Sequence, residues 1–322
     1  MKVSIVTEGT AKTGYGHLTR CLAIYQGFQE KNVFPTFIAN CDKSGRQVLK
    51  DIQIQNINWI AETERLLKMV HGSDITIIDS YLADLSLYEK VSDIAKQCVY
   101  LDDTQRLQYP PGVIINGAVG AEKLLFPKAN KYELLLGLNY TPLRKEFWDI
   151  SRNPLPKSKT DVLVTIGAHD SGEISIQVLE LLLKNFPQYS YHVVLGFHDF
   201  GEKLTLFQKN IGITFYYSLN ARKMRDLMQK CWLAVSAAGQ TSYELARCGV
   251  GMILIQVAEN QVGNITGWSE KGLIRNAIKK DNLPKLIDEF HYLENCHQST
   301  RSQTPGDGVR NIVAYLTKYY SC

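Results

Sequence analysis

A short glycine loop followed by a histidine is the first stretch of this sequence whose residue types could do chemistry. Gly14 and Gly16 flank Tyr15, and the histidine follows directly. Glycines let a backbone turn sharply and approach a ligand closely, because no Cβ stands in the way. A free imidazole has a pKa of about 6.5, so a neutral His17 could take a proton from water as a general base. The alternative is a solvent-exposed histidine in a tight turn, and a bare G-x-G-H pattern does not decide between the two.

The flanking residues predict that this loop joins a buried strand to a helix. Residues 2–7 are rich in β-branched side chains and have the length of a strand. Apolar residues then recur at helical spacing over 18–25, which places His17 in the first turn of a helix. The unpaired N–H groups and positive dipole end of that turn suit a phosphate and favour a neutral imidazole. The spacing is not G-x-G-x-x-G, so it does not support a nicotinamide site.

A second turn of small residues, in the other half of the sequence, predicts a diphosphate site. Residues 236–241 (Ser-Ala-Ala-Gly-Gln-Thr) join a predicted strand to a predicted helix. Backbone N–H groups ahead of a helix bind anions well. Glu244, in what we expect to be the first helical turn, is spaced to accept hydrogen bonds from ribose hydroxyls. An ordinary strand–helix turn is an equally good interpretation of this stretch.

Polar side chains also follow other predicted strands. Asp79 and Tyr81 end one strand, and Asp102-Asp103 ends another; these carboxylates could orient the histidine, bind sugar hydroxyls or cap a helix. The amides of Asn260-Gln261 could donate to sugar or phosphate oxygens. His169, in the small-residue turn 166–171, is a weaker catalytic candidate and could equally be a surface residue.

Composition narrows the class of protein. The chain has 322 residues, of which 45% are hydrophobic and 21% charged, and a formal net charge of +4 without a basic block. These values are typical of soluble globular proteins and do not indicate nucleic acid or an anionic membrane as a partner. The seven cysteines are scattered without a C-x-x-C pair, which favours reduced, mostly buried thiols. We expect a cytoplasmic protein without signal peptide or membrane span, and the oligomeric state stays open.

Strand and helix patterns alternate through both halves of the chain, which indicates βαβ units and parallel sheets. We therefore predict an α/β protein of two doubly wound, Rossmann-like domains with a ligand-binding cleft between them. A proline-rich stretch suggests the boundaries: an N-terminal domain over 1–142, a linker over 143–160 and a C-terminal domain over 161–322. Expected strands are 34–39, 57–60, 75–79, 98–101, 113–115, 133–136, 161–166, 190–195, 213–216, 232–236 and 252–256; expected helices are 18–31, 44–50, 62–71, 85–96, 122–126, 173–185, 221–230 and 242–248, with a helical tail over 284–322 interrupted at 305–308.

Taken in order, these motifs resemble those of the UDP-sugar hydrolases of pseudaminic acid biosynthesis. That family releases UDP from UDP-2,4-diacetamido-2,4,6-trideoxy-β-L-altropyranose and has the two-domain GT-B fold of the lipid II-forming N-acetylglucosaminyltransferase. The matching motifs are Gly14-x-Gly16-His17-x-x-Arg20, Asp79-x-Tyr81, Tyr88-Glu89, Asp102-Asp103, Gly137-Leu138-x-Tyr140-x-Pro142-Leu143-Arg144-x-Glu146-Phe147, Gly167-x-x-Asp170, Ser236-Ala237-x-Gly239, Tyr243-Glu244-Leu245-Ala246, Asn260-Gln261 and Asp307-Gly308-x-x-Arg310.

The resemblance implies a role for individual residues. His17 would be the general base that activates water at the anomeric carbon, the 236–239 turn and Glu244 would bind UDP, and the family uses no metal and no other cofactor. A nucleotide sugar would be the partner of the site. The substrate-binding residues that follow from the motifs are Gly14, Gly16, Arg20, Asp79, Tyr81, Arg144, Asp170, Ser236, Ala237, Gly239, Gln240, Thr241, Glu244, Asn260 and Gln261.

The sequence departs from the family pattern at Ala168-His169, at Gln240 and at Leu82, which leaves the exact sugar open. A glycosyltransferase of the same fold, with a sugar or lipid acceptor in place of water, is the main alternative. A lipid acceptor calls for an exposed apolar patch rimmed by Lys and Arg, and the sequence has no such concentrated block. A non-catalytic nucleotide-sugar sensor is a third possibility.

Overall fold

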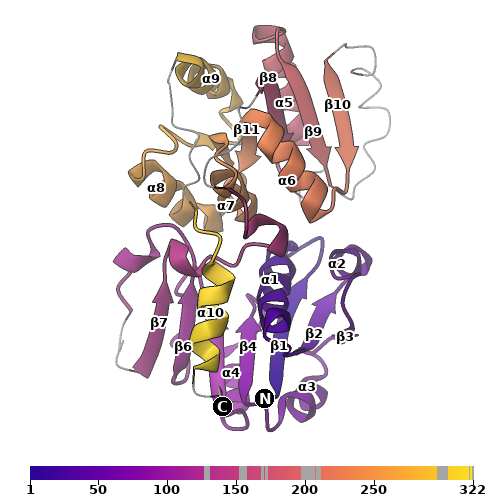
Figure 1. Cartoon of the computed structure of the whole chain (residues 1–322), viewed down its shortest axis with the longest axis vertical. Coiled ribbons are helices and arrows are strands. Elements are labelled where there is room, and N and C mark those ends of the chain that lie inside the picture. Colours follow the sequence, from indigo (N-terminus) through magenta and orange to yellow (C-terminus); the bar gives the residue numbers. More distant parts are fainter. Residues whose placement is uncertain are drawn as a thin grey trace. The chain divides into compact units, whose positions relative to one another are not determined.

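The computed structural model describes residues 1–126, 131–151, 158–167, 170, 173–196, 207, 212–295, 304–318 and 320. The chain divides into two compact units (Figure 1). The first unit comprises Met1–Lys145 and Asp307–Cys322, and the second comprises Glu146–Gly306. His169, Ala168 and the central residues of the predicted linker, 152–157, lie outside the described residues.

The first unit is built on a seven-stranded sheet in the order β3-β2-β1-β4-β5-β6-β7, with every neighbouring pair parallel. The chain runs outward from β1 to β3 and then returns to the other side of β1 with β4. The carboxyl ends of β1 and β4 therefore form the switch point at which ligands bind in doubly wound sheets. The strands are β1 (Val3–Gly9), β2 (Thr36–Cys41), β3 (Ile54–Asn56), β4 (Ile75–Asp79), β5 (Gln97–Leu101), β6 (Gly112–Asn116) and β7 (Tyr132–Leu136); the helices are α1 (Gly16–Glu30), α2 (Lys43–Val48), α3 (Thr63–Val70), α4 (Leu85–Ser92) and α10 (Gly308–Thr317).

The second unit has the same plan. Its six-stranded sheet has the order β10-β9-β8-β11-β12-β13, again parallel throughout, with its switch point between β8 and β11. The strands are β8 (Ser158–Thr165), β9 (Ser190–Leu195), β10 (Ile213–Tyr217), β11 (Cys231–Ala237), β12 (Gly251–Gln256) and β13 (Ile278–Lys279); the helices are α5 (Glu173–Asn185), α6 (Ala221–Lys230), α7 (Gln240–Arg247), α8 (Val262–Glu270) and α9 (Leu286–Asn295).

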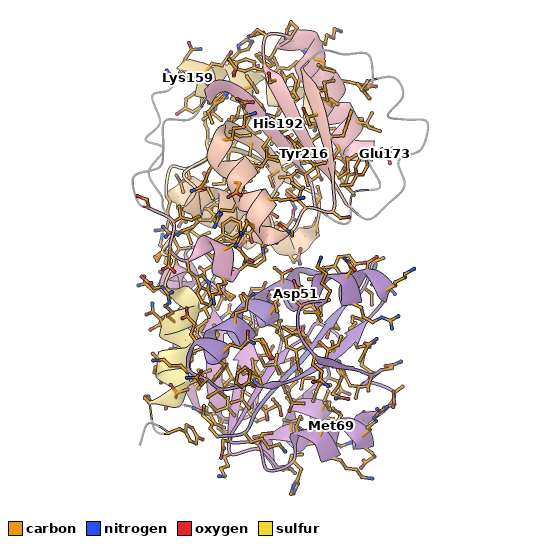
Figure 2. The ribbon with its side chains drawn as sticks, turned by 45° about the vertical axis from the view of Figure 1, so that its right-hand side comes forward. Asp51, Met69, Lys159, Glu173, His192 and Tyr216 are labelled. Carbon is orange, nitrogen blue, oxygen red and sulfur yellow. The ribbon has the colours of Figure 1, made fainter. Side chains whose placement is uncertain are left out.

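A buried polar cluster ties three strands of the second sheet together. His192, labelled with Tyr216 in Figure 2, lies on β9, its Nε2 2.6 Å from Asp161 Oδ1 on β8 and its Nδ1 3.0 Å from the Tyr216 hydroxyl on β10. Lys230 adds an ion pair to Asp161 at 2.9 Å. Buried polar groups need such partners, so this cluster is structural.

The C-terminal helix belongs to the first unit and not, as predicted, to the C-terminal domain. Helix α10, yellow in Figure 1, packs on α1 so closely that a Cβ on Gly27 would lie 2.3 Å from Val309 Cγ1. Arg310 pairs with Glu30 of α1 at 3.0 Å, and Asn311 donates to the Asn139 carbonyl at 2.9 Å. Sequence order places a tail with the domain before it, whereas here the apolar face of the helix is buried on the other unit.

Most predicted elements form, and the exceptions have physical causes. Residues 57–60 are not a strand; the strand at this point is Ile54–Asn56. The apolar character of 57–60 comes from Trp59, which fills the core outside a strand and donates from Nε1 to the Thr7 carbonyl at 2.8 Å. Instead of a helix over 122–126 there is a single 3-10 turn, Ala121–Lys123. Helix α8 was missed because its two glycines weaken the helical pattern.

Two further expectations can be compared with the described residues. The five cysteines that the structure describes are buried thiols, as predicted: Cys21, Cys41, Cys98, Cys231 and Cys248. Within the described ranges, every helix is too short or too polar to cross a lipid bilayer.

Candidate functional site

The loop after β1 leads directly into α1, as predicted. Gly14 has φ 89°, which is strained for a residue with a Cβ, and its N–H donates to the Thr10 carbonyl at 2.8 Å. Helix α1 begins at Gly16, which puts His17 in its first turn. The side chain of His17 is only 5% exposed, so the alternative of a solvent-exposed histidine is wrong.

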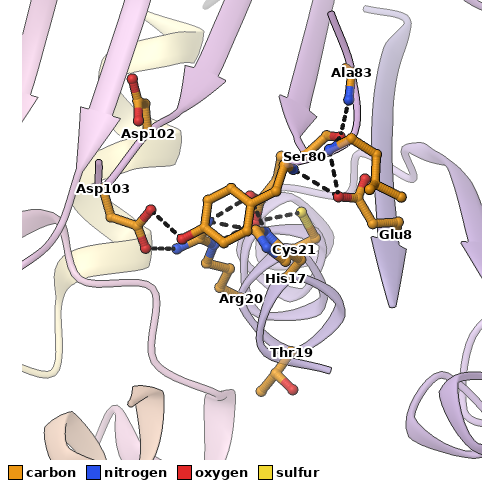
Figure 3. Close-up of polar contacts among 12 residues, drawn as sticks. Glu8, His17, Thr19, Arg20, Cys21, Ser80, Ala83, Asp102 and Asp103 are labelled. Atoms are coloured by element: carbon orange, nitrogen blue, oxygen red, sulfur yellow. Dashed lines mark hydrogen bonds and ion pairs between the residues drawn. The ribbon is translucent and has the colours of Figure 1, made fainter. Parts of the chain in front are cut away.

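Asp79 fixes the orientation of the His17 ring. The carboxylate lies at the carboxyl end of β4, has no exposed surface, and places Oδ1 2.6 Å from His17 Nδ1 (Figure 3). A carboxylate oxygen only accepts, so Nδ1 carries the proton of this bond, and in the neutral ring Nε2 keeps its lone pair. Among the described residues, Nε2 has no hydrogen-bond partner. The pair thus presents an imidazole nitrogen that is ready to accept a proton.

Arg20, one turn further along α1, is occupied by two carboxylates. Its Nε and Nη2 donate to Asp79 at 2.5 and 2.6 Å, and its Nη1 donates to Asp103 at 2.9 Å. Such a fork on a carboxylate is strong and directional. The guanidinium therefore holds the site together, and its bonds to Asp79 and Asp103 leave it little freedom to bind substrate, the role the motif gave it.

Tyr81 completes the group on the side of β4. Its ring meets the His17 ring edge-on, with centroids 4.4 Å apart and an interplanar angle of 89°, and its hydroxyl donates to Asp103 at 2.7 Å. Asp103 is thus the site residue of the Asp102-Asp103 pair. Asp102 accepts the backbone N–H groups of Thr104 and Arg106 at 3.0 and 3.1 Å and so holds the turn after β5; no helix begins there, so the helix cap that the sequence left open does not form.

The charges of this cluster favour an ionised Asp79. Burial by itself would raise the pKa of that carboxyl, but the Arg20 guanidinium and the His17 ring hold it well below its usual range. Asp103 follows the same pattern: burial opposes ionisation, and Arg20 together with the Tyr81 hydroxyl lowers its pKa. An anionic Asp79 stabilises the positive charge that His17 would gain as a base.

Glu8 belongs to the same cluster, although no sequence motif selects it. The side chain is fully buried at the end of β1, and Oε1 accepts the backbone N–H of Tyr81 at 2.7 Å. Burial raises the pKa of this carboxyl, against the lowering effects of the neighbouring Ser80 hydroxyl and of His17. The available signal was a charged residue at the end of an otherwise apolar strand.

In the second unit, the predicted connection between β11 and α7 forms but is shorter than expected: Ser236 and Ala237 end the strand, 238–239 form the turn, and Gln240 and Thr241 begin the helix. Gly239 is the extended residue before the helix, and Gln240 and Thr241 are half-buried at its start. Two side chains hold the carbonyl groups of this turn: Asn264 donates to the Ala238 carbonyl at 2.9 Å, and Ser242 donates to the Gly239 carbonyl at 2.7 Å. The N–H groups at the start of α7 are therefore anchored at the switch point of the sheet, where an anion would be bound.

The other residues predicted to contact the nucleotide differ in their surroundings. Ser236 is buried, and its hydroxyl donates to the Ala237 carbonyl at 3.2 Å, so Ser236 belongs to the strand. Glu244 is 2% exposed and lies in the second turn of α7, deeper than expected. Gln261 lies near the turn, with Nε2 3.8 Å from a Cβ built on Gly239, whereas its neighbour Asn260 is exposed.

Asp170 and Arg144 are the last two of the predicted substrate-binding residues. Asp170 accepts the N–H groups of Ile174 and Ser175 at 3.2 and 2.9 Å, as a helix cap does at the start of α5. Arg144 is half-buried near the end of the first unit.

In the part of the chain that the structure describes, no group of three or more histidine, cysteine or carboxylate side chains could hold a metal ion.

Two curated proteins are similar to the whole or most of the chain, whereas no family model matches it. An uncharacterized protein of Methanocaldococcus jannaschii is 24% identical over 339 residues, covering 100% of this chain and 67% of that protein. The pseudaminic acid cytidylyltransferase and UDP-2,4-diacetamido-2,4,6-trideoxy-beta-L-altropyranose hydrolase of Helicobacter pylori is 27% identical over 298 residues, or 91% of this chain. The chain spans 51% of the length of this second relative.

Solved structures identify the fold. MurG of Acinetobacter baumannii superposes with a TM-score of 0.67 at 14% identity, over 99% of this chain and 100% of that one. The UDP-GlcNAc 2-epimerase of Methanocaldococcus jannaschii, solved with UDP-GlcNAc and UDP, gives 0.66 at 14% identity over the same shares. The predicted GT-B fold, with its two doubly wound domains, is confirmed, and the cleft between the domains stays a prediction.

Proposed function

We propose that this chain hydrolyses a UDP-linked amino-deoxy sugar to UDP and the free sugar, in the biosynthesis of a nonulosonic acid. UDP-2,4-diacetamido-2,4,6-trideoxy-β-L-altropyranose or a close relative is the proposed substrate, and the Helicobacter pylori relative, whose name includes this hydrolase, supports that choice. The observation on which the proposal depends is the 2.6 Å bond between His17 Nδ1 and a buried, ionised Asp79. This bond leaves Nε2 of His17 as the proton acceptor.

In the proposed reaction, His17 Nε2 removes a proton from water as the water oxygen attacks the anomeric carbon. The bond from that carbon to the diphosphate oxygen breaks, and its electron pair leaves with UDP. Asp79 stabilises the imidazolium that forms. The first unit would act on the sugar, while in the second unit the N–H groups at the start of α7 would stabilise the diphosphate and Glu244 would bind the ribose.

A glycosyltransferase with an apolar acceptor is the second candidate, and exposed leucines favour it. Leu82, next to Tyr81, is 46% exposed and Leu125 is 89% exposed. Gln105, two residues after Asp103, donates to the Leu125 carbonyl at 2.7 Å, so Leu125 also lies near the carboxyl end of β5. Apolar side chains at this edge of the sheet could contact a lipid chain.

Release of UDP without an acceptor separates the two candidates. We expect the chain to release UDP from the altropyranose nucleotide when water is the sole acceptor, whereas a transferase would release UDP only when an acceptor is added. His17→Asn should lower this rate by about 10²–10⁴-fold, the usual contribution of a general base, with UDP affinity near normal. His71→Asn, which changes an exposed histidine of the same unit, is the matched control. Full activity in His17→Asn would contradict the proposed base.

A further inference from the structure

Glu8 contacts the turn that carries Tyr81. Strands β1 and β4 are neighbours, with Thr7 paired to Asp79, so Glu8 lies one residue beyond this pair, level with the turn that follows β4. Its side chain has no exposed surface and cannot reach a substrate. Instead, Oε1 accepts the backbone N–H groups of Tyr81 at 2.7 Å and of Leu82 at 3.3 Å (Figure 3).

The rest of this turn is held by other groups. The Ser80 hydroxyl oxygen accepts the N–H groups of Leu82 and Ala83 at 2.9 and 2.8 Å. Arg106 Nη2 donates to the carbonyls of Ser80 and Ala83 at 3.2 and 2.7 Å. These bonds hold the two ends of the turn and the Leu82 N–H, whereas Glu8 accepts the N–H of Tyr81, the residue whose ring lies against His17.

We propose that Glu8 is a positioning residue of the His17 site, which holds the Tyr81 ring beside the base by accepting the backbone N–H groups of Tyr81 and Leu82. This inference extends the proposed hydrolysis, in which His17 is the base. A shift of the turn would displace Tyr81. Its edge-on contact with the His17 ring and its hydroxyl bond to Asp103 would then both change. Misplacement of a catalytic group by about 1 Å can cost about 10²-fold in rate.

Burial favours the uncharged form of Glu8 in this role. Its second oxygen, Oε2, is buried and has no hydrogen-bond partner among the described residues. An ionised carboxylate with one oxygen left unsatisfied in the interior would be strongly destabilising, whereas the neutral acid is tolerated. Of the charged groups near it, His17 lowers its pKa and Asp79 raises it, and burial raises it most. The length of the side chain therefore matters more than its charge.

Two variants separate length from charge. Glu8→Gln keeps the acceptor oxygen at the same reach but cannot ionise, and Glu8→Asp keeps the acid but is shorter by one C–C bond, about 1.5 Å. We expect Glu8→Asp to speed hydrogen exchange at the Tyr81 amide and to lower kcat for UDP release by about 10- to 100-fold, with UDP affinity unchanged. Glu8→Gln should retain the protection of this amide and stay within about threefold of the wild-type kcat. Glu64→Gln and Glu64→Asp, at an exposed position on α3, are the controls.

The results that would overturn the inference are distinct from those that would overturn the hydrolase. If Glu8→Gln lost as much rate as Glu8→Asp while the Tyr81 amide stayed protected, Glu8 would act through its proton and not by positioning. If Glu8→Asp kept wild-type exchange at the Tyr81 amide, the positioning role would be wrong. Amide exchange needs no substrate, so it tests Glu8 even if the wild-type protein releases no UDP.

Discussion

His17 and Asp79 form a buried pair in which a ring nitrogen at the start of a helix meets a carboxylate at the end of a neighbouring strand, 2.6 Å away. The two residues are 62 positions apart in the sequence, and the parallel pairing of β1 with β4 brings them together. The carboxylate in turn is held by Arg20 through two hydrogen bonds. The ring is thus oriented from the interior, which leaves its other nitrogen for chemistry.

Asp79→Asn tests this pairing. The amide cannot provide the negative charge that stabilises an imidazolium, and its NH₂ would oppose the N–H groups of His17 or Arg20. We expect kcat for UDP release to fall by about 10²–10⁴-fold with UDP affinity retained. Because a buried guanidinium loses a charged partner, we also expect a loss of about 3–5 kcal/mol in the stability of the first unit. The control Asp74→Asn, at a more exposed ion pair with Lys96, should lower neither kcat nor the stability of the first unit. A fully active Asp79→Asn would exclude the proposed role of Asp79.

The pH dependence of stability tests the charge of Glu8. Its raised pKa means that the folded protein holds this proton more tightly than the unfolded chain. The corresponding stabilisation is complete below the ordinary pKa of glutamate and is lost as the pH rises through the folded value. Relative to wild type, Glu8→Gln should therefore gain stability with rising pH, by at most about 1.4 kcal/mol per pH unit within that window.

Exchange of the slowest amides of β1 and β4, followed from pH 5 to pH 8, gives this free energy for the first unit alone. A difference between variant and wild type that stays constant over that range would mean that Glu8 ionises in the folded protein as freely as in the unfolded chain.

Glu244→Gln tests the proposed nucleotide site. A carboxylate that accepts hydrogen bonds from ribose hydroxyls contributes about 1.5–3 kcal/mol to binding, so we expect UDP to bind about 10-fold more weakly or worse. Titration calorimetry with UDP measures the affinity. The exposed Glu270→Gln, in the same unit, should bind like wild type. Unchanged UDP affinity in Glu244→Gln would leave this buried residue a purely structural role.

Arg247→Lys tests what supports α7 at its other end. Arg247 is 5% exposed and donates to the carbonyls of Phe147, Trp148 and Ile150 at 2.9, 2.6 and 2.7 Å. An ammonium group cannot reproduce this fork, so we expect a loss of about 2–4 kcal/mol in the stability of the second unit and a lower melting temperature. Arg222→Lys, at an exposed position of α6, is the control. Equal melting temperatures for the two variants would show that the carbonyls find other donors.

Local structure and the candidate base could both be predicted from the sequence. The alternation of apolar runs predicted two parallel sheets, and the Gly14–His17 loop was correctly expected between a strand and a helix. Local patterns suffice to predict these elements because the apolar runs of buried strands and the periodicity of helices depend only on residues close together in the sequence. They fail where an apolar residue serves the core outside a strand, as Trp59 does.

The tertiary structure alone decided which polar residues act together. Asp79, Asp103 and Glu8 are all acidic residues at strand ends, and the sequence does not distinguish them. Folding pairs Asp79 with His17 and Arg20, and it places Glu8 against the backbone N–H of Tyr81. The tertiary structure also decided the place of α10, whose apolar face packs on α1 although the two helices lie near opposite ends of the sequence. Charge states and partners depend on burial and on distances between remote residues, which no local pattern contains.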